Sequence, residues 1–227
     1  MTLIGCLSEG CHLAVTSAVP GFTGFVAEDF DLFAIEGFAP RMEALRGHLR
    51  PRLVSLAEAL GPHLSAVAGH TLYPHVAAHL RRSVNPPPET WAAFGPDPRR
   101  YKALAHFAVG IEARGLWLRL VLKDEALRDR TALAQRLRAG RRATLARLPA
   151  DMAVHTATGS RPVGASTADG EIARLRRKSE AAWAVGRDVA RTEPALRSAA
   201  GVEALILDAC AAILPVWRLL PSWPNEL

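Results

Sequence analysis

Residues 106–122 read HFAVGIEARGLWLRLVL, and their pattern decides the fold of the surrounding chain. Apolar side chains alternate with other residues on both sides of a short interruption, Ala-Arg-Gly at 113–115. Alternation with a period of two is typical of strands that bury one face, and a short glycine-containing interruption is typical of a tight turn. The stretch therefore predicts an antiparallel hairpin.

Helical and strand patterns follow each other in the chain after this hairpin. Leu133, Leu137 and Leu148 mark the buried stripe of an amphipathic helix expected over 128–148, with most of its arginines outside that stripe. The later expected elements are a strand at 152–155, a flexible loop at 158–170, a basic helix at 171–181, a strand at 181–189 and a long helix at 193–216.

The chain before the hairpin is mainly helical in pattern. Residues 25–35 predict a short helical turn followed by an edge strand, and residues 38–60 carry apolar side chains at helical spacing. Pro51 is expected to divide the latter segment into two helices, because proline removes a backbone donor. The Gly61-Pro62 pair is expected to end the second of these, with a short third helix running to Ala68.

Residues 73–107 hold the densest mixture of groups that bind ligands or move protons. Tyr73-Pro74 predicts the start of a helix on which His75, His79 and Arg82 share a face, because proline is favoured in a first turn. Asn-Pro-Pro-Pro at 85–88 predicts a rigid extended connector that leads into a strand at 91–94.

These elements predict a single α+β domain, an antiparallel sheet flanked by helices, over residues 22–227. The length of 227 residues and the apolar content of 49% suffice for a sizeable core. The longest apolar runs are interrupted by charges, so we expect no membrane-spanning helix. Residues 1–21 contain no Lys or Arg and lack the pattern of a signal peptide, and we interpret them as a disordered arm or a misannotated start.

The three cysteines do not form the pattern of a disulfide framework. Cys6 and Cys11 lie in the N-terminal arm, whereas Cys210 lies in an apolar helical pattern. This arrangement favours a reducing compartment, and we therefore expect a cytoplasmic protein.

The formal net charge of +6 is concentrated in two regions. Residues 128–197 carry 15 Lys and Arg against 7 Asp and Glu, and residues 73–107 carry 5 against 2. The two regions would form one anion-binding face if the fold brings them together. The basic helices are open to three interpretations, a solvated face, a lipid surface or a nucleic-acid surface, and the excess of 25 Arg over 3 Lys also suits a GC-rich genome without any binding role.

A cluster of cations and aromatic residues has the composition of a phosphate or nucleic-acid site, because guanidinium forks bind phosphate and aromatic rings stack on bases. Its members are Arg81, Arg82, Trp91, Arg99, Arg100, Tyr101 and Lys102. Alternatively, the two aromatic residues belong to the core and the arginines pair with acids such as Asp29, Asp31 and Glu36. A nucleic acid is the preferred partner, and a phosphorylated small molecule the alternative.

Three histidines, His75, His79 and His106, are the local candidates for acid–base chemistry. An enzyme acting on a phosphorylated or nucleotide substrate is therefore the second hypothesis. The spacing of His75 and His79 is that of two metal ligands on one helical turn, but Val76 stands where a zinc hydrolase would carry its glutamate, and we predict no metal and no cofactor. The sequence leaves DNA or RNA and the oligomeric state open.

The order of motifs resembles that of the YktB family of small bacterial proteins, which carry a domain of unknown function. The similarity spans residues 25–220, and Arg100 and Leu80 depart from the family pattern. The residues that carry it are Arg41-Met42, Tyr73-Pro74-His75-Val76, His79, Arg81-Arg82, Asn85-Pro86-Pro87, Thr90-Trp91, Ala93-Phe94 and Tyr101-Lys102, with weaker echoes at Val185-Gly186-Arg187 and Leu214-Pro215. The resemblance implies a single α+β domain and no assigned activity.

Overall fold

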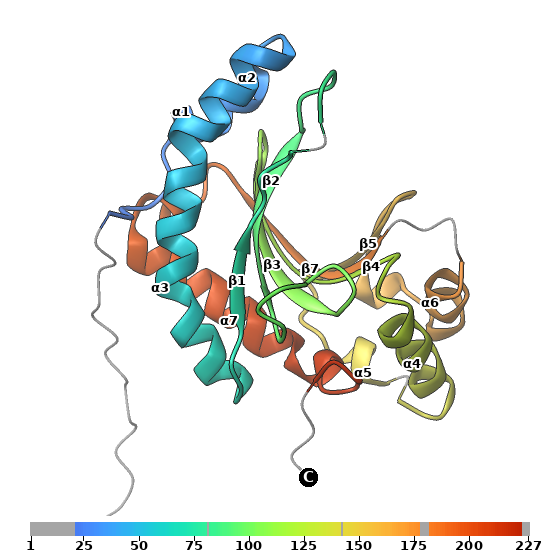
Figure 1. Ribbon diagram of the computed structural model, residues 1–227. Helices are drawn as coiled ribbons and strands as arrows, with labels where there is room; N and C mark the ends of the chain where they lie inside the picture. Colours follow the sequence, from blue (N-terminus) through green and yellow to red (C-terminus); the bar gives the residue numbers. More distant parts are fainter. Residues whose placement is uncertain (1–20, 81, 142, 178–181, 224–227) are drawn as a thin grey trace, which may run out of the picture.

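An antiparallel sheet of seven strands organises the computed structural model, which describes residues 21–80, 82–141, 143–177 and 182–223 (Figure 1). The strands follow the order β1-β2-β3-β4-β7-β5-β6, and all their pairs are antiparallel. Their bounds are Tyr73–Val76 (β1), Glu89–Gly95 (β2), His106–Glu112 (β3), Gly115–Lys123 (β4), Ala153–Thr156 (β5), Gly159–Pro162 (β6) and Ala182–Ala190 (β7). The predicted α+β class is confirmed.

The predicted hairpin is formed by β3 and β4 at the centre of the sheet. Its register pairs Glu112 with Gly115 at the turn and His106 with Val121 at the open end. Gly115 has a φ of +149°, and a Cβ at this position would overlap the carbonyl oxygen of Val189 on β7. Glycine is therefore required where the hairpin turns beside β7.

Helices cover one face of the sheet (Figure 1). The α-helices are α1 (Ala27–Asp31), α2 (Phe38–Ala44), α3 (Arg50–Ala68), α4 (Leu127–Arg138), α5 (Ala143–Ala146), α6 (Ala168–Leu175) and α7 (Ala199–Trp217). A π-helical turn at Leu45–Leu49 joins α2 to α3, and 3₁₀ turns lie at Leu32–Ala34, Val163–Ala165 and Pro194–Arg197. Leu53 of α3, Leu133 of α4, Ile172 of α6 and Ile206 of α7 all belong to one main core.

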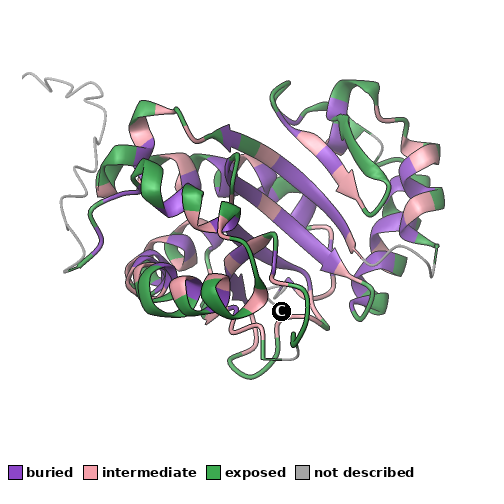
Figure 2. Ribbon diagram, turned by 90° about the horizontal axis from the view of Figure 1, so that it is seen from above, coloured by how far each residue is buried: buried purple, intermediate pink, exposed green. Residues whose placement is uncertain are grey.

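The main core also takes the inward side chains of the strands, such as Phe94, Phe107, Leu118 and Trp183, each fully buried. Each large apolar side chain that is removed from water stabilises the fold by about 1.5–3 kcal/mol. The buried residues in Figure 2 run along the strands and along the inner sides of the helices that face them. Burial on the helix-covered face is therefore the main stabilising contribution.

The helix α7 is long and apolar enough to cross a membrane by length and composition alone. Its side chains Ile206, Cys210 and Ile213 are completely buried in the main core, and it packs against α3 and β4. Core helices of soluble proteins meet the same criterion, so composition alone is weak support for a membrane span.

Six local expectations were wrong, and one of them is the loop expected at 158–170, which contains β6 and a 3₁₀ turn. The structure has a 3₁₀ turn and no strand at residues 32–34, and it has strand β1 where a helix was expected from Tyr73. The helix α3 runs unbroken from Arg50 to Ala68, because Pro51 lies in its first turn and the helix continues through Pro62. The helix expected over 128–148 is divided into α4 and α5, and Gly140 between them has a φ of +100°, which suits a helix end.

The expectation for residues 1–21 falls outside the described residues except for Gly21. The strands expected at 91–94, 152–155 and 181–189 are confirmed within one or two residues by β2, β5 and β7. The long C-terminal helix is also confirmed, although its regular part begins at Ala199.

Candidate nucleic-acid interface

The second face of the sheet carries a small cluster of its own, which we call the open face. Its buried members are Ala93, Ala108, Trp117, Val121 and Ala184, and Trp91, Tyr101 and Ala182 pack against them. All of these belong to strands except Tyr101, which lies in the turn after β2. The described α-helices other than α2 contribute their buried apolar residues to the main core instead.

Small residues make the floor of the open face, and two of them are glycines that a larger residue cannot replace. A Cβ at Gly110 would overlap the indole of Trp117, and a Cβ at Gly186 would overlap the carbonyl oxygen of Leu118. The Trp117 side chain therefore lies flat across β3, where its Nε1 donates to Glu89 Oε2 at 2.8 Å. Burial raises the pKa of Glu89.

Aromatic rings line the β1–β3 side of this floor. The Trp91 Nε1 donates to the Tyr101 hydroxyl at 3.3 Å. The Tyr101 ring lies between two imidazoles, with its centroid 5.2 Å from that of His75 and 4.8 Å from that of His106. The His79 ring meets Trp91 edge-on at 5.3 Å. Three aromatic or imidazole groups from separate segments thus surround Tyr101.

Two cations lie on the indoles of the open face. Lys123 Nζ is 5.0 Å from the Trp91 ring centroid, and the Arg119 guanidinium is 4.9 Å from that of Trp117. Arg119 also pairs with Asp188 at 2.5 Å. Burial lowers the pKa of Lys123, and the positive charge of Lys102 lowers it further. Lys102 and Lys123 are therefore close enough to repel each other beside Trp91.

The histidines differ in burial and in hydrogen-bond partners. His106 is 1% exposed, and burial lowers its pKa to about 4, so its ring is neutral at pH 7 and donates from Nδ1 to the Leu104 carbonyl at 2.9 Å. His75 donates from Nε2 to the Asp97 carbonyl at 3.1 Å. Burial, with the charges of Arg82, Arg46 and Lys102, lowers the pKa of His79.

His79 has a backbone φ of +50°, the one positive φ at a non-glycine position in the described part of the chain. Its Nε2 lies 3.1 Å from Thr90 Oγ1, and together with the Trp91 contact this holds the ring against the end of β2. Left-handed backbone at such a residue costs about 1–2 kcal/mol. The His75-x-x-x-His79 spacing is not a helical turn, because β1 ends at Val76.

The structure brings together Trp91, Tyr101, Lys102 and the three histidines of the predicted site. Arg99 and Arg100 are exposed in the turn after β2, where their backbone N–H groups donate to Asp97 Oδ1. Arg82 is exposed in the connection at the opposite end of β2, and Arg81 lies outside the described residues. The seven residues of β2 separate the two ends by about 20 Å.

Two of the three acids that were expected to neutralise these arginines, Asp29 and Asp31, have other partners. Asp29 contacts His48 and Arg52, at 2.9 and 3.3 Å, and Asp31 pairs with Arg191 at 2.8 Å. Among the described residues, no group of three or more His, Cys, Asp or Glu side chains is arranged to hold a metal ion.

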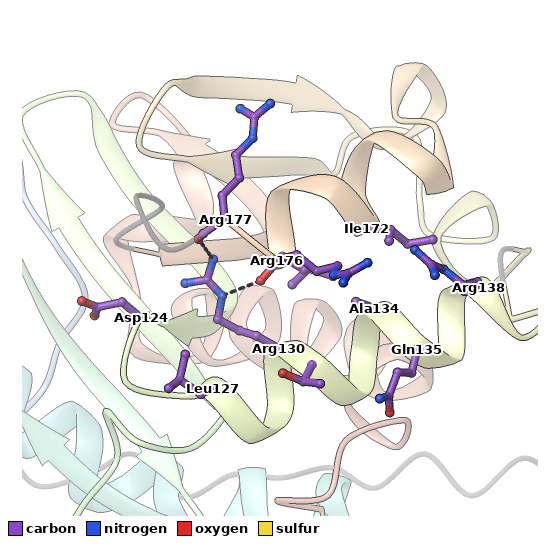
Figure 3. Close-up of a pocket in the computed structure, with 11 residues that line it drawn as sticks. Asp124, Leu127, Arg130, Ala134, Gln135, Arg138, Ile172, Arg176 and Arg177 are labelled. Carbon is purple, nitrogen blue, oxygen red and sulfur yellow. Dashed lines mark hydrogen bonds between the residues drawn. The ribbon is translucent and has the colours of Figure 1, made fainter.

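The expectation that the basic helices join the same face is wrong. The α6 carboxylate Glu171 accepts a hydrogen bond from Trp183 Nε1 at 2.9 Å, and Trp183 belongs to the main core. The helices α4 and α6 therefore lie on the side opposite the open face, where they border a cavity of about 750 Å³ (Figure 3).

Sequence reasoning missed Trp117, Arg119 and Lys123 on the open face, as well as His155 on β5. His155 pairs with Ala184 across the sheet, and burial lowers its pKa to about 4. The missed signal is the alternation of β4, where leucines at 116, 118, 120 and 122 face the core and Trp117, Arg119, Val121 and Lys123 face the other way.

An antiparallel sheet with helices on one face and with aromatic and basic side chains on the other defines a single-domain α+β protein. The chain belongs to the family described as a domain of unknown function, DUF1054, whose profile matches residues 25–217. This match confirms the family resemblance that the sequence motifs indicated.

Named relatives are bacterial and carry no assigned activity in their names. A UPF0637 protein of Bacillus velezensis is 53% identical over 87 residues, which are 38% of this chain and 41% of that protein. A UPF0637 protein of Staphylococcus aureus strain Newman is 44% identical over 102 residues, which are 45% of this chain and 50% of that protein. The matched part thus spans half or less of each relative.

Proposed function

We propose that this protein binds single-stranded nucleic acid in the cytoplasm, with bases against the open face and phosphates against its cations. The observation that supports this most directly is the position of Lys123 Nζ, 5.0 Å from the ring centroid of the partly exposed Trp91. Trp117 is 6% exposed and its cation Arg119 pairs with Asp188, so we assign the base contacts to Trp91. Base–aromatic stacking and backbone cations together are the usual means of binding a single strand.

The shape of the site favours a strand over a mononucleotide. Exposed arginines lie in the connections at both ends of β2, a strand that spans about 20 Å and carries Trp91. The cavity between α4 and α6 and the one beside α2 and the π-helical turn contain none of these residues. A duplex keeps its bases stacked inside, so it would gain only the phosphate contacts.

Fluorescence polarisation with labelled oligonucleotides of about 20 nucleotides tests this proposal. Single-stranded DNA, single-stranded RNA and duplex DNA would be compared at about 50 and 200 mM salt. If four cations contact phosphates, single-strand affinity falls roughly 50-fold between these salt concentrations. No single-strand binding at the lower salt would make the proposal wrong.

Two double variants locate the surface. Replacing Lys102 and Lys123 by Gln, or Arg99 and Arg100 by Ala, is expected to weaken binding. The number of counterions released on binding, read from the slope of log affinity against log salt concentration, is expected to fall by about one to two. The matched control is Arg136→Gln with Arg147→Gln, which removes two exposed charges from the helix-covered side. An equal loss in the control would assign binding to net charge instead of the open face.

A Trp91→Leu variant tests stacking separately from charge. Loss of one stacked base is expected to cost about 1–3 kcal/mol of binding free energy, with little change in the salt dependence. Circular dichroism of each variant confirms that a loss of binding does not reflect unfolding.

An enzyme that acts on a phosphorylated or nucleotide substrate is the second candidate. It is favoured by one observation, the position of Tyr101 between the rings of His75 and His106 beside Lys102. The full burial of His106 fits a structural role better than proton transfer to a substrate. Release of inorganic phosphate from a nucleotide panel by the wild type, abolished in His75→Ala, would favour this candidate.

A further inference from the structure

The cavity between α4 and α6 combines an aliphatic floor with arginines at its rim. The small side chain of Ala134 lies opposite Ile172 and Leu175, all three of them buried, and the exposed Leu127 borders the end near β4. Arg138 and Arg176 line the cavity from α4 and from the end of α6, as Figure 3 shows. The floor contains no aromatic side chain among the described lining residues.

Arg130 fixes the distance between the two helices. It is 2% exposed, and its guanidinium donates to the carbonyl oxygens of Leu175, Arg174 and Arg177 at 3.1, 3.3 and 3.0 Å. These carbonyls lie at the C-terminal end of α6, which a positive charge stabilises. The groove is therefore a built feature, because a buried side chain of one helix holds the end of the other.

The rim of the groove is basic at both ends. Arg138 closes α4 at one end, and Arg176 follows the end of α6 that Arg130 holds, nearer to Leu127 (Figure 3). Asp124, just after β4, is the one carboxylate among the described lining residues. Leu127 and Arg138 are the first and last of the twelve residues of α4, which places them about 16 Å apart. An extended peptide of about five residues covers this length.

We propose that this groove binds an acidic segment of a partner protein that carries aliphatic side chains. Its carboxylates pair with Arg138 and Arg176, because guanidinium forks bind carboxylates bidentately, and its leucine or isoleucine side chains rest on Ala134, Ile172 and Leu175. An aliphatic floor does not suit nucleic-acid bases, which stack on aromatic rings, so this site is independent of the open face.

A peptide array tests the proposal on the whole protein. Glutamate, glutamine, leucine and serine are permuted over about eight positions, so that every spacing of acid and aliphatic residue is present. Peptides that contain both glutamate and leucine are expected to bind, and those with glutamine or serine in their place are expected to lose at least about tenfold in affinity. An array without any such dependence would overturn the proposal.

Three variants assign the binding to the groove. Arg138→Glu and Arg176→Glu are each expected to weaken the best peptide about tenfold or more, and Ala134→Met is expected to weaken it by filling the floor. Arg136→Glu is the matched control, because Arg136 is exposed on α4 but does not line the groove. Equal losses in Arg136→Glu and Arg138→Glu would overturn the assignment.

The same variants separate this proposal from the nucleic-acid proposal. Arg138→Glu and Arg176→Glu are expected to leave the binding of single-stranded oligonucleotides within about twofold of the wild type. If oligonucleotide binding falls with peptide binding, the groove is part of a nucleic-acid path and the partner-peptide proposal is wrong. If only oligonucleotide binding is absent in the wild type, the open-face proposal fails and the groove proposal stands.

Discussion

The indole N–H of Trp91 on β2 donates to the hydroxyl of Tyr101 at 3.3 Å, which fastens the turn after β2 onto the open face of the sheet. Tyr101 also touches the backbone position of Gly95, where a Cβ would lie 3.4 Å from that of Tyr101. The turn that carries Arg99, Arg100 and Lys102 is thus positioned by one aromatic pair.

Tyr101→Phe is expected to lower the free energy of unfolding by about 1 kcal/mol, because it removes the acceptor of the half-buried Trp91 N–H. Urea unfolding measures this change, and Tyr73→Phe is the matched control, since Tyr73 is exposed on β1. Equal effects at the two tyrosines would contradict a specific role for the Trp91 contact.

Gly110→Ala is expected to destabilise the protein by about 1–3 kcal/mol, because the new methyl group overlaps the Trp117 indole and forces it off β3. The bond from Trp117 Nε1 to Glu89 would be lost with it, so tryptophan fluorescence is expected to shift as well. Gly47→Ala serves as the comparison, since a Cβ there meets no atom within 4 Å. A neutral Gly110→Ala would show that the indole does not lie across this position.

Acid is expected to destabilise the fold through His106. Its pKa is about 4 in the folded protein and about 6.5 in the unfolded chain, so the unfolded chain binds more protons between these values. The contribution of the neutral His106 ring to the free energy of unfolding is complete above pH 6.5. It is lost as the pH falls toward 4, by an amount on the order of 3 kcal/mol. Urea unfolding at several pH values between 7.5 and 4.5 measures this slope.

His106→Asn is expected to flatten part of that slope, because the amide can donate to the Leu104 carbonyl without titrating. His155 contributes with the same sign, since burial also lowers its pKa to about 4. The double variant His106→Asn with His155→Asn is therefore expected to show a smaller acid sensitivity than either single variant. An unchanged slope in the double variant would assign acid sensitivity to other groups.

Asp29 is expected to be the most costly carboxylate to remove from the N-terminal part. It is completely buried, accepts from the Val26 N–H at 2.9 Å, and contacts His48 and Arg52. Asp29→Ala is expected to cost about 3–5 kcal/mol, because it leaves these donors without their acceptor. Asp31→Ala removes a more exposed pair with Arg191 and is expected to cost under about 1 kcal/mol. Thermal unfolding ranks the two variants.

Local patterns of the sequence were sufficient for the central strands. The leucines of β4 alternate with the open-face residues, and the β3–β4 turn contains the glycine that its backbone requires. The strand β1 was not predictable in this way, because proline at position 74 suits both a first helical turn and an edge strand. What decides for the strand is the pairing of Tyr73–Val76 with Ala92–Gly95, a contact distant in sequence.

The candidate site was predictable in composition but not in its boundaries. Trp91, Tyr101 and Lys102 are neighbours in sequence and in space, whereas Lys123 joins them only because β4 is brought beside β3 and the turn after β2 folds over the sheet. The separation of the basic helices from this face also depends on tertiary structure. It follows from the burial of Glu171 against Trp183, which no local pattern indicates.

Arg130→Met is expected to loosen the end of α6 without unfolding the sheet. The methionine side chain retains much of the aliphatic packing against α4 but cannot donate to the carbonyls of Arg174, Leu175 and Arg177. Amide hydrogen exchange over residues 171–177 is expected to become faster, while that of β3 and β4 stays slow, because local opening requires less free energy than global unfolding. Arg128→Met, an exposed position two residues earlier on the same helix, is the control. Uniform acceleration across the sheet would show that Arg130 supports the whole fold and is not a local tie between the two groove helices.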